Sequence, residues 1–404
     1  MVKPERRTRA DLLAAAAIAA VVVVVAALIW WTSDARATIS RPAASPVKTL
    51  APAKAVPASL RELWDAPSPK TTKPVLAGGS VVTGDGHRVD GRDPGTGSVL
   101  WSYARDLDLC GVTSVYNYAV AVYPDARGCG QVSTIDGQTG MRGPSRTAYA
   151  DPEIKLSSDG TTVLAAGESR LELWRSDMVR MISYGALDAR IKPGVPGPVL
   201  CRLESAAAST AAVSVLESCP DQPDLRLTIL RPAKEEDTPD LKYVQLPGVK
   251  PDSGARVVAV SETTTAVYVP TPRPSLMIID ETGSTTANLP LPEPASPQNA
   301  ATSAGDLVTW WTGDAVMVFA ASGLQYRYTV GPVGTRVPIG PATMMAGRLL
   351  IPVSDGVGVY DPANGVDERF IPLPRRPAQS AVVPSVAGSV LLEQRGPTLV
   401  ALGG

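Results

Sequence analysis

Short runs of alternating apolar and polar residues recur from about residue 75 to the C-terminus, each ended by Gly, Pro, Asp or Asn. Alternation with a period of two predicts strands with one buried face. No helical pattern of useful length interrupts the runs after the N-terminal segment, so the pattern predicts an all-β protein. Eight of these runs begin at Ser80, Ala119, Thr162, Ala212, Ala266, Leu307, Leu349 and Val390.

A turn with a recurring sequence follows the next strand of each unit. The clearest copies are "VDGRDPGTGSVLW" around Asp93, "VSTIDGQTGM" around Asp136, "LMIIDETGST" around Asp280 and "VGVYDPANGV" around Asp361. The copies are roughly 40 to 56 residues apart, which is typical of four-stranded propeller blades. The repeat predicts one β-propeller of eight blades, or of seven if residues 190–251 hold an irregular insertion. Weaker copies lie around Arg175, Arg231, Ala321 and Leu402.

The eighth unit has no outer strand at the C-terminus. Residues 60–67, "LRELWDAP", end in the same Leu-Trp pattern as the outer strand "SVLWSY" of the first unit. We infer that this N-terminal strand completes the last blade and closes the ring. Closure removes the open sheet edges that would otherwise pair with other chains.

The N-terminal segment differs from everything that follows. Residues 12–31 contain no charge and are long enough to cross a hydrocarbon core of about 30 Å as a helix. The excess of cations before this run predicts a cytoplasmic N-terminus. A cleavable signal peptide is the alternative, with "DARA" at residues 34–37 as its processing site. The preceding cations are Lys3, Arg6, Arg7 and Arg9.

These patterns divide the chain into four parts. Residues 1–11 are a cytoplasmic stub, 12–31 a transmembrane anchor, 32–59 an Ala/Pro-rich tether and 60–404 a periplasmic propeller. The tether shows no apolar periodicity and is expected to be semi-extended. The location is therefore an inner membrane, with a single pass and the propeller in the periplasm.

Four cysteines are present, and an even number in an exported chain predicts two disulfides. Cys110 and Cys129 occupy the same places in the second unit as Cys201 and Cys219 in the fourth, with nearly equal separations. We therefore expect the pairs 110–129 and 201–219, with a stapling role. Four buried free thiols are the alternative. The formal net charge is −1, which gives no electrostatic reason to expect a nucleic-acid partner.

The unit containing Asp93 resembles the repeat of quinoprotein-type, PQQ-like β-propellers. The resemblance covers roughly residues 60–404 and is strongest around Asp93, Asp136, Asp280 and Asp361. It implies that the Asp and Thr-Gly shape the turn and that the Trp packs between neighbouring blades. Enzymes of that family carry adjacent cysteines over the quinone, and this chain has none, so no quinone cofactor is expected.

The order of stub, anchor, tether and exported propeller is similar to envelope proteins of mycolate-making actinobacteria. The nearest group is the membrane-tethered propeller described as a polar growth factor. That resemblance implies a role in trafficking trehalose monomycolate with an RND-type exporter.

Few residues offer chemistry. The only histidine, His87, lies in a predicted hairpin turn, so neither a Ser/His/Asp arrangement nor a zinc pattern can be built. No metal site is expected. The Pro-rich segment "PLPRRPAQ" at residues 372–379 is expected to be an exposed connection between blades.

The best candidates for ligand binding are Trp310, Trp311, Tyr326 and Tyr328. Successive strand residues point to opposite faces, so the two Trp side chains cannot share a packing site. Aromatic side chains with a polar tip suit sugars and lipids. Packing between blades is the alternative for these residues.

The sequence favours a non-enzymatic propeller that binds a ligand or scaffolds partners in cell-envelope assembly. Two alternatives remain: a degenerate quinoprotein-like or sugar-acting enzyme, and an interaction platform without a small ligand.

Overall fold

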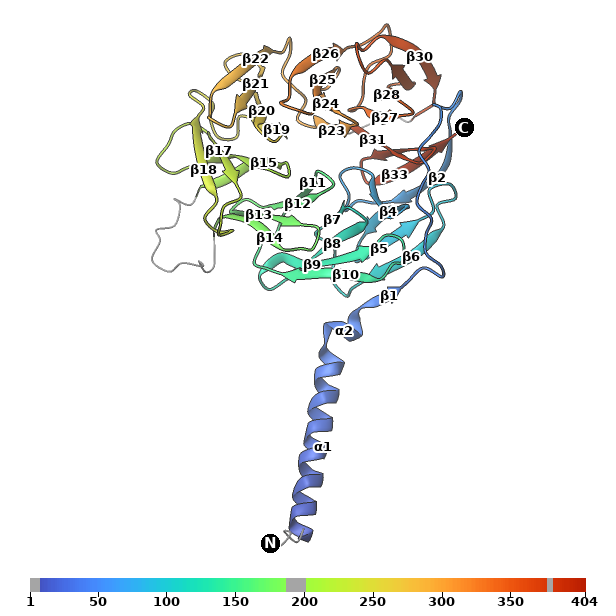
Figure 1. The fold of residues 1–404 in the computed structure, drawn as a ribbon, viewed down its shortest axis with the longest axis vertical. Helices are drawn as coiled ribbons and strands as arrows, with labels where there is room; N and C mark the ends of the chain where they lie inside the picture. Colours follow the sequence, from blue (N-terminus) through green and yellow to red (C-terminus); the bar gives the residue numbers. More distant parts are fainter. Residues whose placement is uncertain (1–7, 187–200, 376–380) are drawn as a thin grey trace.

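The computed structural model describes residues 8–186, 201–375 and 381–404. It consists of a ring of β-sheets and a helix that leaves the edge of the ring (Figure 1). Helix α1 (Arg9–Thr32) is long and apolar enough to cross a bilayer, a property that anchors share with signal sequences near the N-terminus. A single turn, α2 (Asp34–Ala37), connects α1 to the ring.

Eight sheets form the blades, which confirms the prediction of eight and excludes the seven-bladed arrangement. In each sheet the strands are antiparallel, and the first strand of blades one to seven lies innermost. The first two blades are β3 (Val75–Ala77), β4 (Ser80–Asp85), β5 (Arg88–Arg92) and β6 (Val99–Ala104), then β7 (Gly111–Val115), β8 (Tyr118–Asp125), β9 (Gly128–Asp136) and β10 (Arg142–Thr147). The next two are β11 (Lys155–Ser158), β12 (Thr162–Ala166), β13 (Arg170–Arg175) and β14 (Arg180–Gly185), then β15 (Arg202–Ala208), β16 (Val213–Ser218), β17 (Arg226–Arg231) and β18 (Asp240–Gln245).

The second half of the ring repeats this order. The fifth and sixth blades are β19 (Arg256–Val260), β20 (Thr264–Val269), β21 (Ser275–Asp280) and β22 (Thr285–Pro290), then β23 (Ala300–Ala304), β24 (Leu307–Trp311), β25 (Val316–Ala320) and β26 (Tyr326–Val330). The last two are β27 (Thr343–Met345), β28 (Arg348–Val353), β29 (Gly356–Tyr360) and β30 (Asp367–Pro372), then β31 (Val382–Ala387), β32 (Val390–Arg395), β33 (Thr398–Gly403) and β2 (Arg61–Pro67).

The N-terminal strand closes the ring, as predicted. Strand β2 pairs antiparallel with β33, so residues from the two ends of the propeller share the last blade. Residues 190–200, the first part of the region 190–251 predicted as a regular unit or an insertion, lie outside the described residues. The described remainder of that region forms the four regular strands of the fourth blade.

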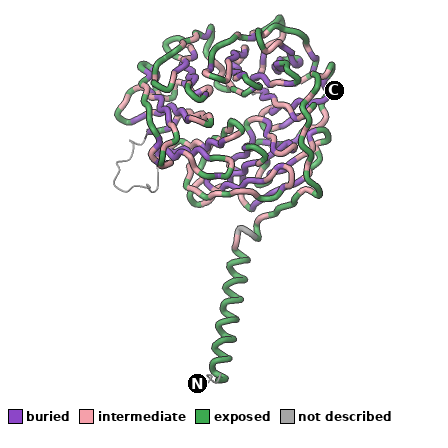
Figure 2. The backbone as a smooth tube through the Cα atoms, viewed as in Figure 1, coloured by how far each residue is buried: buried purple, intermediate pink, exposed green. Residues whose placement is uncertain are grey.

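The apolar core lies between blades, and the buried segments are distributed around the whole ring (Figure 2). One cluster of buried side chains lies at each of the eight junctions between neighbouring blades in the described part of the chain. The first cluster, for example, joins Val82 and Trp101 of the first blade to Val112 and Ile135 of the second. Each blade therefore depends on its two neighbours for burial of its faces.

The repeated Asp shapes the outer turn, as the resemblance implied. The Oδ1 atom of Asp93 accepts hydrogen bonds from the backbone N–H groups of Gly95 and Thr96 and from the Thr96 hydroxyl. Asp136 makes the equivalent three bonds in the second blade. A short polar side chain that bonds the backbone two and three residues ahead stabilises a turn without a ligand.

The segment predicted as a tether is instead bound to the ring. Its first part, β1 (Ile39–Arg41), pairs with β6 and adds a fifth strand to the first blade. Beyond β1, the backbone N–H groups of Ala43 and Val47 donate to Thr139 and Gln138 in the second blade. We call residues 42–59 the strap.

The strap crosses three junctions. Ala43 and Val47 pack on the junction of the first and second blades, Leu50 on that of the eighth and first, and Ala53 and Val56 on that of the seventh and eighth. From Val47 onward these residues recur every three positions, which is the period of a polyproline II helix and places them on one face. A period of three differs from the periods of two and about 3.6 that indicate strands and helices, so those patterns did not predict these contacts.

Candidate functional site

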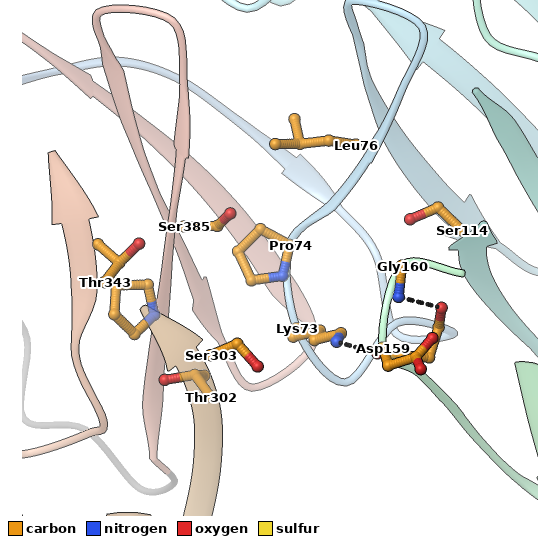
Figure 3. A pocket seen from close by; sticks show the side chains of 12 residues that line it. Lys73, Pro74, Leu76, Ser114, Asp159, Gly160, Thr302, Ser303, Thr343 and Ser385 are labelled. Atoms are coloured by element: carbon orange, nitrogen blue, oxygen red, sulfur yellow. Dashed lines mark hydrogen bonds between the residues drawn. The ribbon is translucent and has the colours of Figure 1, made fainter. Parts of the chain in front are cut away.

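The innermost strands surround a cavity of about 250 Å³ on the ring axis. Figure 3 shows its polar lining, which comes from six of the eight blades. Most of the lining side chains are small and carry hydroxyl groups. They are Ser114 on β7, Ser158 on β11, Thr302 and Ser303 on β23, Thr343 on β27 and Ser385 on β31.

The one lysine of this lining, Lys73, precedes β3. Its Nζ donates to the backbone oxygen of Ser158 at 3.1 Å, which links the first blade to the third. Burial lowers the pKa of the Lys73 amine, and the negative charge of Asp159 opposes this effect. An ammonium group has three donors, so two remain for a ligand or for water.

Asp159 lies beside Lys73 in the turn between β11 and β12. It accepts hydrogen bonds from the backbone N–H groups of Thr161 and Thr162 and from the hydroxyl of Thr210 in the fourth blade. Burial acts to raise the pKa of this carboxyl, but these hydrogen bonds outweigh it and the pKa is lowered. Asp159 therefore supplies a fixed negative charge next to the ammonium group.

Tyr116 is hydrogen-bonded to the lining of the cavity. It lies in the turn between β7 and β8, and its backbone N–H donates to the oxygen of the lining residue Gly160 at 2.9 Å. The ring is 61% exposed, and the backbone has a φ of 47°. A bulky residue at positive φ is uncommon and is often found at functional sites.

The arrangement suits recognition of a small polar molecule. The hydroxyls of Ser114, Ser303, Thr343 and Ser385 have no hydrogen-bond partner among the described residues, so they can bond a ligand. Ligand pockets usually measure about 300–1,000 Å³. A cavity of about 250 Å³ therefore holds a group of the size of one sugar ring.

A second cavity, of about 660 Å³, lies between the outer strands of the second and third blades. Arg146 and Arg180 line it, but both already pair with the buried Glu172, at 3.1 and 3.0 Å. These two arginines therefore neutralise a buried carboxylate at the junction between blades. The central cavity is the better candidate for ligand binding.

The structure places Trp310 and Trp311 on opposite sides of the sixth blade, as expected for adjacent strand residues. Trp310 lies in the junction with the fifth blade, where Nε1 donates to Oδ1 of Asn299 at 3.0 Å. Trp311 lies in the junction with the seventh blade and donates to the oxygen of Pro338 at 2.9 Å. Both indoles are buried, as expected for the alternative in which these residues pack between blades.

The two tyrosines differ from each other. Tyr328 is packed in the same junction as Trp311, and its hydroxyl donates to the oxygen of Pro362 at 2.7 Å. Burial and the charge of Asp361 raise its pKa to about 12. Tyr326 is 44% exposed and touches Phe319. The four residues are not brought together, and ligand binding by them stays a prediction for which only Tyr326 offers an exposed ring.

Both predicted disulfides are present, Cys110–Cys129 and Cys201–Cys219. The carboxylate of Glu217 lies near the second disulfide, but it is already bonded by Tyr184 and Arg226. His87 is exposed in the turn between β4 and β5, outside the lining of the central cavity.

The segment predicted as an exposed connection, residues 372–379, contains a buried cation. The side chain of Arg375 is 2% exposed, pairs with the fully buried Glu393 and donates to the oxygen of Val353 at 2.7 Å. The predicted exposure was therefore wrong for Arg375. The buried carboxylate of Glu393 on β32 requires a cation as its partner, and Arg375 supplies it. Residues 376–380 lie outside the described residues.

Sequence reasoning missed Lys73, Asp159 and Tyr116. The signal for Asp159 is "SDG" at residues 158–160, but Asp-Gly between two strands is first of all typical of a hairpin turn. Nothing in the local sequence of Lys73 or Tyr116 indicates that the ring brings them to the same cavity.

No family model matches this chain, and no curated protein matches it. Among solved structures, the computationally designed protein Ika8 is similar over 84% of this chain and 98% of its own, with 14% identity and a TM-score of 0.53. BamB from Moraxella catarrhalis has 14% identity and a TM-score of 0.47, covering 86% of this chain and 98% of its own. The dihydro-heme d1 dehydrogenase NirN has 15% identity and a TM-score of 0.46, covering 85% and 75%. The likeness to Ika8 shows the propeller fold and nothing beyond it.

Proposed function

We propose that this chain is a membrane-anchored propeller that binds a ligand or holds partner proteins outside the cytoplasmic membrane, without catalysing a reaction. The observation that carries the proposal is the central cavity, where hydroxyl groups from several blades surround the Lys73 ammonium group. Such a lining binds through many weak polar contacts. Lys73 Nζ donates to the backbone oxygen of Ser158, and among the described residues it has no hydrogen bond with a serine hydroxyl, whereas an activated nucleophile is usually bonded to its base.

The ligand class we propose is a glycolipid headgroup. Hydroxyl groups that both donate and accept match the alternating donors and acceptors of a sugar, and Tyr116, whose backbone bonds the lining residue Gly160, offers an exposed ring. Together with the resemblance of the sequence, this supports handling of trehalose monomycolate with an RND-type exporter in envelope assembly and polar growth. The cavity accommodates one sugar ring, so the acyl chain would lie outside it.

Native mass spectrometry of the full chain in detergent, with trehalose monomycolate added, tests this proposal. We expect a bound complex for the wild type and at least about tenfold weaker binding for Ser114→Leu, which fills the cavity, and for Tyr116→Ala. The matched control is Ser145→Leu, an exposed position on β10. Absence of binding to the folded wild type, or equal loss in the control, would contradict the proposal.

An interaction platform without a small ligand is the second candidate. The exposed ring of Tyr116 favours it as well, because aromatic residues are enriched at protein interfaces. Co-purification of the exporter in detergent separates the two candidates. A platform predicts that Tyr116→Ala releases the exporter while Ser114→Leu retains it.

A further inference from the structure

The anchor is joined to the ring by very little chain. Six residues separate the end of α1 from β1, and four of them form the single turn α2. A helical residue advances about 1.5 Å and an extended one about 3.4 Å, so β1 begins within about 16 Å of the end of α1. The polar headgroup layer beyond the hydrocarbon core is about 5–7 Å thick.

Figure 1 shows α1 leaving the outer edge of the ring, on the side formed by β6 and β10, in a view that shows the ring face-on. Pairing of β1 with β6 fixes this attachment. The next blade lies close to it, because a Cβ added to Gly140 would be 3.2 Å from the Cα of Pro42. The outer strands of the first two blades are therefore nearest to the membrane.

The side chains on this edge resemble those of proteins that lie on bilayers. We call Ile39, Arg41, Met141 and Arg142 the anchor-side rim. Ile39 is 54% exposed and Met141 60% exposed. Arg41 and Arg142 are exposed, and neither has an ion-pair partner among the described residues. The Arg142 guanidinium lies 5.9 Å from the centre of the Tyr103 ring, which leaves its charge without a counter-ion. Exposed apolar residues interleaved with cations that form no ion pair suit an anionic membrane surface.

Asp106, in the loop after β6, is an acid on the same side. Arg36 offsets its charge: Arg36 lies between α1 and the rim, with its guanidinium 3.7 Å from the centre of the Trp31 ring. Arginine over tryptophan is a stable pair at the membrane interface, where one group contacts lipid and the other water.

We propose that the anchor-side rim docks on anionic lipid headgroups, so that the ring stands upright on the membrane with its axis parallel to the bilayer. This inference rests on the membrane anchor of the proposed function. Both faces of the ring, and the mouth of the central cavity, then open sideways. A lipid leaving the membrane would pass around the edge of the ring to reach the cavity.

The test uses full-length protein in nanodiscs, labelled on one added cysteine, since all four native cysteines are in disulfides. Ser145→Cys places a fluorophore on β10, and Thr285→Cys places the control on β22, on the far side of the ring. Lipids with a nitroxide headgroup quench nearby fluorophores. With phosphatidylglycerol present, we expect quenching at position 145 to be at least about threefold that at position 285.

Charge reversal completes the design. Arg41→Glu with Arg142→Glu should reduce quenching at position 145 to the level of position 285, whereas Arg273→Glu with Arg327→Glu, on the far side, should not. Equal quenching at both labelled positions, or no effect of phosphatidylglycerol, overturns the inference and leaves the rim open to a protein partner. If alkaline carbonate extracts the chain from the membrane, the anchor of the proposed function fails instead.

Discussion

The indole N–H of Trp101 donates a hydrogen bond to the backbone oxygen of Gly137, 2.9 Å away in the next blade. The same bond joins Trp64 to Pro94 at 2.8 Å and Tyr328 to Pro362 at 2.7 Å. In each case the acceptor follows the turn Asp, and the aromatic residue comes from the outer strand of the preceding blade. This inter-blade bond makes Tyr328 the counterpart of the two tryptophans.

We expect Trp101→Leu to destabilise the protein by about 3–5 kcal/mol, because it removes a buried indole and its hydrogen bond. Trp101→Phe retains most of the ring, so only about 1–3 kcal/mol should be lost with the hydrogen bond. Urea unfolding measures both. Tyr326→Leu, on an exposed ring, should stay within about 0.5 kcal/mol of the wild type. Equal losses for the Leu and Phe variants would show that the hydrogen bond, not the packing, dominates.

Gly91 and Gly160 should respond to alanine for different reasons. A Cβ at Gly91 would lie 2.0 Å from Cε2 of Trp101, so Gly91→Ala displaces the indole and should cost about 3 kcal/mol or more. Nothing lies within 4 Å of a Cβ at Gly160, but its φ is +95°. Gly160→Ala should therefore cost only the backbone strain of about 1–2 kcal/mol. A larger loss at Gly160 than at Gly91, measured by urea unfolding, would contradict this account.

Replacing Cys110 and Cys129 by alanine should cost about 3 kcal/mol. The disulfide closes a loop with a sequence separation of 19, and loop closure of that length restricts the unfolded chain by about this amount. Thermal unfolding of the double variant, with and without reductant, measures the effect. Reductant should lower the melting temperature of the wild type by more than that of the variant; a similar drop in both would assign the stability to the second disulfide.

Lys73 should make stability depend on pH in the alkaline range. Its pKa in the folded state lies below 10.5, so folding disfavours the charged amine, and the cost is fully present below the folded pKa. The cost disappears as the pH rises from the folded pKa to 10.5. Lys73→Met should therefore be more stable than the wild type near neutral pH, and the difference should narrow as the pH rises.

Denaturant titrations of the two proteins at several pH values measure this difference. Lys54→Met, on the exposed face of the strap, is the control and should show no such trend. A wild type that is more stable than Lys73→Met at neutral pH would show that the contacts with Ser158 and Asp159 outweigh the burial of the amine.

The strap should resist trypsin although Lys48 and Lys54 lie within it. Cleavage requires the backbone of the strap to leave the ring. The two are in close contact at Lys48, because a Cβ added to Gly79 would lie only 2.4 Å from the backbone oxygen of Lys48. Val47→Asp removes an apolar contact with the first junction and should increase the cleavage rate at Lys48 by about tenfold or more. Ala44→Asp, at an exposed position, is the control. Rapid cleavage of the wild type would mean that the strap is a free tether.

Several features followed from the sequence because they depend on local chemistry. Alternation predicted the strands, and the spacing of the turn Asp residues predicted eight blades. The hydrogen bonds of the Asp93 turn join atoms within four consecutive residues, so the sequence motif is sufficient to predict the turn. The pairing of Cys110 with Cys129 followed as well, because both lie within one blade.

The remaining features depend on contacts between residues that are far apart in the chain. Val47 and Val56 pack against apolar junctions only because the closed ring places these junctions next to the strap. The sequence left Trp310 open to ligand binding or to packing between blades, and only its neighbours from the fifth blade show that it is packed. The sequence determined the blades because each blade is a local unit. Only the tertiary structure decided the central cavity, because Lys73 and Asp159 belong to different blades and meet only when the ring closes.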